Sequence, residues 1–474
     1  MDIREILAGL GYKDTPGTSW YDNITLWLAW YSGKSKFHAY TVYNGSKHVG
    51  CTRKTLGMAK KIAEDKADLL LNEKVEIVVT PKNATNNDEP KVNLLQEYVD
   101  AVLDANNFWV RGNQLVELAH ALGTGAFVEF LDGKDVRIDY VPAMCIVPLR
   151  WRNREITECA FASKLSTGDN EQTYVQLHRI YDKDGVTQLD RGNYVVSNKL
   201  FGKDGKEKAL PQGVEAEWKT GSAKPMYQII MPNIANNIDI SSPMGVSVYS
   251  NAIDDLETVD MAYDSFHNEF KLGKKRVFVD DSMLKPNPVD QTLMPIFDTN
   301  DTLFYGIPMN DGAKPIHESN PELRIDDHIK GIQAALDVLS EKCGFGKGYY
   351  KFDGDNMSTA TQVISQNSKL YRRVRKDVTP LEKALVDMTR AILFLGGKGT
   401  DAAVSINSDD SIIEDTDAKA NRAMREKTAG IIDDVEYFME TRNLDEEAAQ
   451  ELVKKIAERR PPEPPTPDLF GGGA

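Results

Sequence analysis

GFGKGYYKFDGDNMSTATQVISQNSKLYRRVRKD, residues 344–377, begins as a loop rich in glycine and continues as a helix. Gly344, Gly346 and Gly348 alternate with aromatic and basic residues, and after Gly354 neither glycine nor proline occurs until Pro380. Glycine adopts backbone conformations that other residues avoid, so we expect these three positions to act as hinges. The side chains that such a loop would present are those of Phe345, Lys347, Tyr349, Tyr350 and Lys351.

The run that follows the loop predicts a long helix over residues 358–397. Its apolar residues recur every three or four positions, as on one face of a helix. Thr359 and Gln362 fit a capping box at its start, and Gly396 with Gly397 fits its end. We therefore expect a rigid element directly behind the loop.

Thr379 and Pro380 interrupt this long helix. Pro380 has no backbone N–H to donate, and Thr379 with Glu382 fits a second capping box. The sequence leaves two alternatives open: a single kinked helix, or two helices that meet at an elbow.

Before the loop, two helices with coiled-coil-like spacing flank a segment of short strands and prolines. The helices are expected at 245–272 and 325–343, and the insert at 273–324. Spacing alone favours a helical hairpin with an inserted subdomain. The apolar seams of the two helices include Leu256, Val259, Tyr263, Phe266, Ile329, Ile332, Leu336 and Leu339.

The first 244 residues mix helices and strands, so the predicted fold class is mixed α+β. Periodic apolar residues indicate a helix near 56–70. A β-hairpin is expected at 126–140, where Asp132-Gly133 supplies a two-residue turn, and 176–189 repeats the pattern. These elements give no strong indication of function by themselves.

The C-terminal part is acidic and predominantly helical. Apolar periodicity predicts a helical unit within 401–460. Residues 461–474 contain the run PPEPPTP, which is incompatible with regular helix or sheet, so we expect a disordered tail.

Composition and charge exclude several classes of protein. The chain has 474 residues and a net charge of −15, which argues against a protein that grips nucleic acid through many basic contacts. Its four cysteines lack the spacing of a zinc site or a disulfide framework. The early apolar stretch NITLWLAWYSG is too short to span a bilayer, and the first residues lack the pattern of a secretory signal. We expect neither a membrane segment nor a leader.

No motif in the sequence indicates an enzyme. The complete patterns GxxxxGK[ST], HExxH and GxSxG are absent. His120 and His267 have no partner in the local sequence and are expected to be structural. The pairs Asp254-Asp255 and Asp326-Asp327 are interpreted as solvated helix faces. We therefore predict no catalytic residue, no metal ligand and no cofactor.

Several stretches in their order resemble one family. PMGVSVYSNAIDDLETVDMAYDSFHNEFKLGKKRVFV (243–279) and GKGYYKF with STATQVISQNSKLYRRVRK (within 346–376) are similar to segments of portal proteins from long-tailed bacteriophages that infect Gram-positive bacteria. LLLNEKVEIVV (69–79) and VLDANNF (102–108) resemble the wing of the same proteins. The resemblance covers most of the chain.

The resemblance implies a portal fold in a ring of twelve subunits with a central channel. It assigns 1–244 and 358–397 to the wing, 245–272 and 325–343 to the stem, 273–324 to the clip, 344–357 to the tunnel loop and 401–460 to the crown. In such a ring the stem seams would also pack against neighbouring subunits. Lys347 and Lys351 would touch DNA phosphates, and Tyr349 and Tyr350 would line the duplex loosely. The alternative for the loop is a plain surface loop whose aromatic rings pack on their own subunit.

The resemblance also implies partners and a location. A portal lies at one capsid vertex, after assembly in the host cytoplasm, and joins head to tail while double-stranded DNA is packaged and ejected through it without sequence-specific binding. Its implied partners are a packaging terminase with ATPase activity, a head-completion adaptor, and the major capsid and scaffolding proteins. Two alternatives stay open: another structural ring such as a tail component, and a cytoplasmic hydrolase that uses His120.

Overall fold

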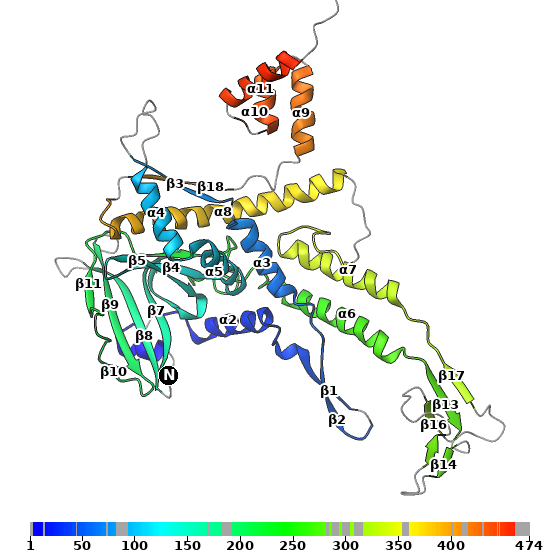
Figure 1. The fold of residues 1–474 in the computed structure, drawn as a ribbon. Coiled ribbons are helices and arrows are strands. Elements are labelled where there is room, and N and C mark those ends of the chain that lie inside the picture. The colour runs from blue at the N-terminus through cyan, green and yellow to red at the C-terminus, as the bar shows by residue number, and fades with distance from the viewer. Residues whose placement is uncertain are drawn as a thin grey trace, which may run out of the picture. The chain divides into compact units, whose positions relative to one another are not determined.

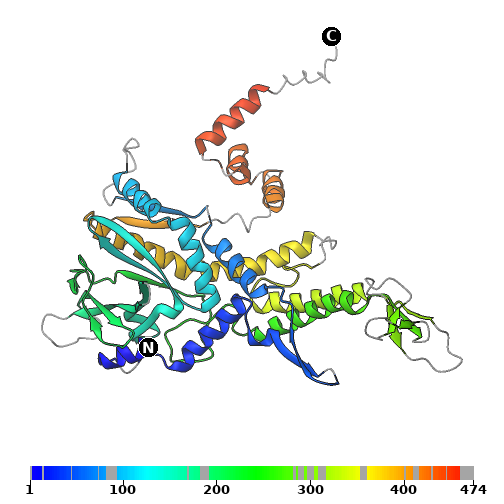
Figure 2. The same ribbon diagram turned by 60° about the horizontal axis from the view of Figure 1, so that its bottom comes forward.

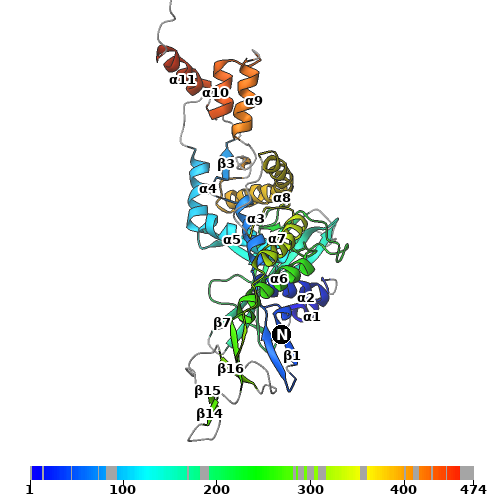
Figure 3. The same cartoon turned by 90° about the vertical axis from the view of Figure 1, so that its right-hand side faces the viewer.

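The structure is a computed structural model that forms two compact units. It describes residues 3–12, 15–43, 45–72, 74–81, 93–167, 170–181, 192–280, 284–286, 293–295, 304–307, 316–352, 360–399, 402–408, 416–428, 431–442, 444 and 446–459. Unit 1 comprises residues 1–359 and 369–408, and unit 2 comprises residues 360–368 and 409–474. Figures 1 to 3 show the chain in three orientations.

Helices and antiparallel sheets form the first part of unit 1, as the predicted α+β class requires. The helices are α1 (Ile3–Gly9), α2 (Thr18–Tyr31), α3 (Met58–Leu70), α4 (Leu94–Ala105) and α5 (Phe108–Leu122), with short 3-10 turns η1 (Lys36–His38) and η2 (Ala143–Cys145). The largest sheet contains β6 (Ile146–Arg152), β7 (Glu155–Thr167), β8 (Asn170–Tyr181), β9 (Asn193–Gly202), β10 (Glu207–Lys208) and β11 (Glu217–Lys219).

Three smaller sheets complete this part (Figure 1). One has the order β12 (Tyr227–Ile230), β4 (Gly125–Asp132), β5 (Asp135–Pro142). Another pairs β3 (Glu76–Thr80) with β18 (Ala403–Asn407), so the first residues of the expected crown belong to a sheet of unit 1. The third is a two-stranded hairpin of β1 (Ala39–Tyr43) and β2 (His48–Thr52).

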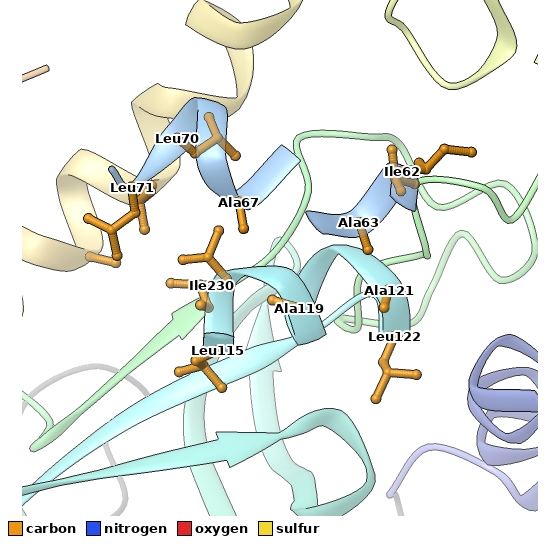
Figure 4. Close-up of a cluster of buried hydrophobic side chains, with 14 of the residues drawn as sticks. Ile62, Ala63, Ala67, Leu70, Leu71, Leu115, Ala119, Ala121, Leu122 and Ile230 are labelled. Atoms are coloured by element: carbon orange, nitrogen blue, oxygen red, sulfur yellow. The ribbon is translucent and has the colours of Figure 1, made fainter. Parts of the chain in front are cut away.

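The core of unit 1 forms where α3 packs across α5. Ala63 and Ala67 of α3 face Ala119 of α5, and these small side chains let the two helices approach closely (Figure 4). Gly123 then ends α5 with φ +87°, two residues before β4 begins. A Cβ at Gly123 would lie 2.4 Å from the backbone oxygen of Gly245, so this helix-to-strand turn requires glycine.

The hairpin expected at 126–140 exists, with a turn shifted by one residue. Asp132 pairs with Asp135, so the two loop residues are Gly133 and Lys134 instead of Asp132 and Gly133. Gly133 has φ +65°, which places the glycine at the first turn position. The second expected turn, at Asp184-Gly185, lies outside the described residues.

The two seamed helices form a hairpin with an inserted subdomain, as spacing alone favoured. They are α6 (Ile253–Leu272) and α7 (Ile325–Lys342), and they pack against each other along their length (Figure 2). The expected start of the first helix at residue 245 is wrong: residues 245–252 precede α6 as loop and turn, and Val248 there donates its N–H to the carbonyl of His120 at 2.9 Å. In the insert, β13 (Arg276–Asp280) pairs with β16 (Phe304–Ile307) in parallel and with β17 (Ile316–Ser319) in antiparallel orientation. A separate pair joins β14 (Leu284–Pro286) and β15 (Leu293–Pro295).

The long helix is one element, α8 (Ala360–Leu395), with Pro380 inside it. The alternative of two helices is therefore wrong, and so is the second capping box. The Thr379 hydroxyl donates to the carbonyl of Arg375, one turn earlier, at 3.1 Å, and Glu382 accepts from the Ser408 hydroxyl at 2.7 Å. Thr359, half of the first capping box, lies outside the described residues.

The described part of unit 2 is helical, as expected for the C-terminal region. It contains the first turns of α8 and the helices α9 (Thr416–Thr428), α10 (Asp434–Arg442) and α11 (Glu446–Arg459), and α10 packs against both α9 and α11. The Lys427 ammonium of α9 lies 2.8 Å from the Asp434 carboxylate of α10, and this ion pair joins the two helices. The proline-rich tail lies outside the described residues. Among the residues that the structure describes, no helix has the length and apolar character to cross a membrane.

Candidate functional site

The glycine loop leaves α7 through a tight C-terminal turn. Gly344, at φ +84°, donates its N–H to the carbonyl of Glu341 at 3.2 Å, and Phe345 donates to the carbonyl of Ser340 at 2.9 Å. This pair of bonds is a Schellman motif, in which a left-handed glycine ends the helix and the next residue makes an apolar contact. The loop therefore starts with a fixed direction. Gly346 at φ +92° and Gly348 at φ +79° confirm that each of the three glycines adopts a left-handed conformation.

Phe345 anchors the loop in the core of unit 1. Its ring is 1% exposed and lies 4.6 Å from the ring of Tyr349 and 5.4 Å from that of Tyr350. Tyr350 is also buried. In this conformation residues of the same chain cover Phe345 and Tyr350, so neither ring can line an open channel. For these two residues the structure shows the alternative, in which aromatic rings pack on their own subunit.

A buried cation lies over the Phe345 ring. The ammonium of Lys66, on α3, is 4.7 Å from the ring centre, a cation–π arrangement. The same ammonium lies 3.4 Å from a carboxylate oxygen of Asp377 on α8, and the Arg373 guanidinium lies 3.7 Å from that oxygen. Burial lowers the pKa of the Lys66 ammonium, and the Asp377 carboxylate opposes that shift. The loop root, α3 and α8 thus meet at one ion pair.

Two polar residues of α7 hold the rest of the loop, and sequence reasoning missed both. Asp337 accepts the N–H of Gly348 at 3.2 Å. Gln333, one turn earlier, accepts the N–H of Phe352 at 2.9 Å and donates to the carbonyl of Tyr350 at 3.0 Å. The side-chain amide of Gln333 also donates to the Asp337 carboxylate at 2.8 Å. Their spacing of four residues on one helix was the available signal.

Three other side chains in the described part of the loop reach the surface. Lys347 is exposed, and its ammonium lies 3.8 Å from the Asp337 carboxylate. Tyr349 is 39% exposed, and partial burial raises the pKa of its hydroxyl to about 12. Lys351 is exposed as well. Within the described part of the loop, residues 344–352, the exposed side chains of Lys347, Tyr349 and Lys351 could therefore contact a molecule outside this subunit in this conformation.

The apolar seams of α6 and α7 lie where their spacing predicts. The fully buried positions are Leu256, Val259, Ile332, Leu336 and Leu339. Tyr263 and Phe266 are half-buried and contact Phe352, with ring centres 6.4 and 5.7 Å apart. Ile329 is half-buried. These seams pack on each other within one chain, and Phe352 joins the loop to them.

Ion pairs hold α6 and α7 together at both ends. Arg324 donates two bonds to the Glu269 carboxylate, at 2.8 and 3.2 Å, and this lowers the pKa of Glu269 to about 2. At the opposite end Lys342 pairs with Asp255. Asp255, part of one predicted solvated pair, therefore has a structural partner.

His120, the residue on which the hydrolase alternative depends, is enclosed. Its Nδ1 lies 2.8 Å from the carbonyl of Val116, and burial lowers the pKa of its ring, so the imidazole is neutral. The cavity beside it has a volume of about 10 Å³, too small for a substrate. Within the described residues no group of three or more His, Cys, Asp or Glu side chains could hold a metal ion.

A known protein family matches most of the chain. Residues 12–462 match the family model described as "Phage portal protein, SPP1 Gp6-like". No curated protein matches the chain. The matched range contains the stem helices, the insert, the glycine loop and α8.

Proposed function

The chain belongs to the SPP1 Gp6-like family of phage portal proteins, and from this premise we propose how its parts form a DNA channel. A protein of this family connects head and tail and lets DNA pass, as an oligomeric ring at the capsid vertex. The proposal is that twelve copies close the ring, with α6 and α7 as stem, 273–324 as clip and the loop at 344–357 beside the channel. A Gram-positive host remains part of the proposal.

The observation that carries the channel role is the division of the loop into an anchored part and an exposed part. Phe345 and Tyr350 hold the loop to its own subunit, while Lys347, Tyr349 and Lys351 are exposed. A lysine reaches phosphate as a point charge, and an aromatic ring meets a duplex without reading its sequence. Such a loop contacts passing DNA without binding one site.

The net charge of the chain favours a channel through which DNA slides over one that holds DNA in place. Twelve copies at −15 each give about −180 for the ring. Tight DNA binding comes from many basic residues that replace phosphate counterions, and an acidic wall with few lysines lacks that term.

The proposed partners follow from the same parts. The clip would meet the terminase and the head-completion adaptor, and the wing would meet the major capsid and scaffolding proteins. Assembly would take place in the host cytoplasm before the ring enters the virion.

Cryo-electron microscopy of the purified full-length protein tests the arrangement. We expect closed rings with an axial hole that is bordered by residues 344–352. A homogeneous monomer at micromolar concentration in low and high salt would contradict the ring. Rings that carry Tyr349 on their outer rim would contradict the loop assignment alone.

A further inference from the structure

The β1–β2 hairpin projects from the rest of unit 1 as an arm (Figures 1 and 3). We define the arm as residues 36–54. Its two strands pair only with each other among the described strands. An isolated two-stranded hairpin is only marginally stable in water, so an arm of this kind normally packs against another surface.

One face of the arm is apolar and uncovered. Val42 and Val49 are direct cross-strand partners, so both side chains lie on one face, together with the partners Tyr40 and Cys51. Val42 is 46% exposed and Val49 is 37% exposed. The Arg53 guanidinium lies 4.2 Å from the centre of the Tyr40 ring and covers it in part, so the uncovered apolar part of this face consists of Val42 and Val49.

The root of the arm is fixed to the stem by two buried carboxylates of α6. Asp260 lies 2.8 Å from Nε2 of His38 and accepts the N–H of Leu56 at 2.8 Å. Asp264 accepts the N–H of Lys54 at 2.9 Å. Both ends of the arm are therefore held on one stem helix, which sets the direction of the arm. An arm with a fixed root and a bare face is prepared to contact a neighbouring body.

Charge identifies the kind of partner. The arm contains Lys36, Lys47, Arg53 and Lys54 and no acidic residue, in a chain of net charge −15. By contrast, α6 has six acidic residues and one lysine; four of the six, Asp255, Asp260, Asp264 and Glu269, contact partners within the same chain, and Asp254 is exposed. The arm and the stem are thus oppositely charged parts of the same chain.

The outer faces of the stem helices combine acidic and apolar side chains. On α6, the exposed Asp254 and Met261 are seven residues apart and share a face. On α7, the exposed Asp327 and Val338 lie on one stripe, with Gly331 between them. Met261 is 50% exposed and Val338 is 51% exposed. A basic arm with two valines matches this surface in both charge and polarity.

We propose that the apolar face of the arm, at Val42 and Val49, docks on the outer faces of α6 and α7 of a second copy of this chain. This inference rests on the proposed ring, because only side-by-side copies bring a stem within reach of a neighbour's arm. The arm then couples each stem to the next through its root at Asp260 and Asp264.

Photo-crosslinking tests the contact. Full-length protein with benzoylphenylalanine at position 49 is mixed from ¹⁴N- and ¹⁵N-labelled batches, assembled, irradiated and analysed by mass spectrometry. We expect crosslinks between differently labelled chains that join residue 49 to peptides within 253–272 or 325–342. The matched control carries the same group at Val214, which has the same exposed fraction of 37% and lies outside the arm.

Each outcome separates the inference from the proposed function. Rings without intermolecular arm-to-stem crosslinks, or with crosslinks from residue 49 to DNA or another protein, overturn the arm contact and leave the ring intact. Wild-type protein that never assembles overturns both.

A paired variant gives a second measurement. Val42→Ser with Val49→Ser should raise the protein concentration for half-assembly by about tenfold, since each interface loses the burial of two valines. The Val214→Ser control should leave that concentration unchanged. Docking is contradicted if the double variant reaches half-assembly at the same concentration as the wild type while the circular dichroism of its monomer is unchanged.

Discussion

The Lys66 ammonium lies 4.7 Å from the centre of the Phe345 ring, and both side chains are at most 1% exposed. Lys66 is on α3, and Phe345 follows α7 by only a few residues. This contact places the start of the glycine loop in the core of the subunit. The root of the loop is therefore fixed, while Lys347, Tyr349 and Lys351 are exposed, and the following predictions test that division.

Phe345→Ala should destabilise the whole subunit. Removal of the fully buried ring leaves a cavity and takes away the aromatic face on which the Lys66 ammonium lies. The free energy of unfolding should therefore fall by about 3–5 kcal/mol. Tyr349→Ala, which truncates the half-exposed neighbouring ring, should cost about 1 kcal/mol. Urea unfolding of both variants measures the difference. Equal losses would contradict the anchor role of Phe345.

Asp337→Ala should release the loop while the fold stays intact. The N–H of Gly348 loses its acceptor, a bond that contributes about 1 kcal/mol, so its amide exchange should accelerate roughly fivefold. Hydrogen exchange resolved to residues 346–352 measures this. Asp327→Ala, at an exposed position of the same helix, should leave those rates unchanged. Unchanged exchange in Asp337→Ala would show that the side chain does not hold the loop.

Gly346→Ala should impair DNA packaging more than ring assembly. A Cβ at position 346 meets no atom within 4 Å, so the cost is the strain of a left-handed alanine, about 1–2 kcal/mol within the loop. The matched control is Gly213→Ala, outside the loop, where the glycine also has φ +92° and an added Cβ also meets no atom within 4 Å. That change carries the same strain of about 1–2 kcal/mol and should leave packaging intact. Packaged DNA per assembled ring is the measurement, and equal loss of packaging and assembly in Gly346→Ala would assign the glycine a purely structural role.

Glu129→Gln should change how stability depends on pH. Complete burial raises the pKa of Glu129 from 4.5 to about 8, so the folded chain keeps a proton that the unfolded chain has released. Folding then takes up a proton between these values, and stability falls as the pH rises through that window. The variant lacks this titration, so it should match the wild type near pH 4 and exceed it by roughly 4–5 kcal/mol at pH 8 and above.

Urea unfolding at the two pH values checks this prediction. Glu97→Gln, at an exposed helical position, should run parallel to the wild type. A wild-type curve with the same pH slope as Glu129→Gln would mean that Glu129 ionises normally in the folded chain.

The sequence by itself determined the local elements and their order. The spacing of apolar residues predicted α6, α7 and α8, and the three glycines marked the left-handed positions of the loop, because helix periodicity and glycine's backbone freedom act over a few residues. The order of the motifs also indicated the portal family that the family match then showed.

Only the tertiary structure decided which side chains meet. No local pattern reveals that Lys66 and Asp377, 311 residues apart, form a buried pair beside Phe345. Nor does it reveal that Pro380 stays within one helix or that Tyr350 turns inward while Tyr349 stays half-exposed. Burial and pairing of this kind depend on the packing of α3, α7 and α8 around one core, and distant parts of the chain supply that packing together.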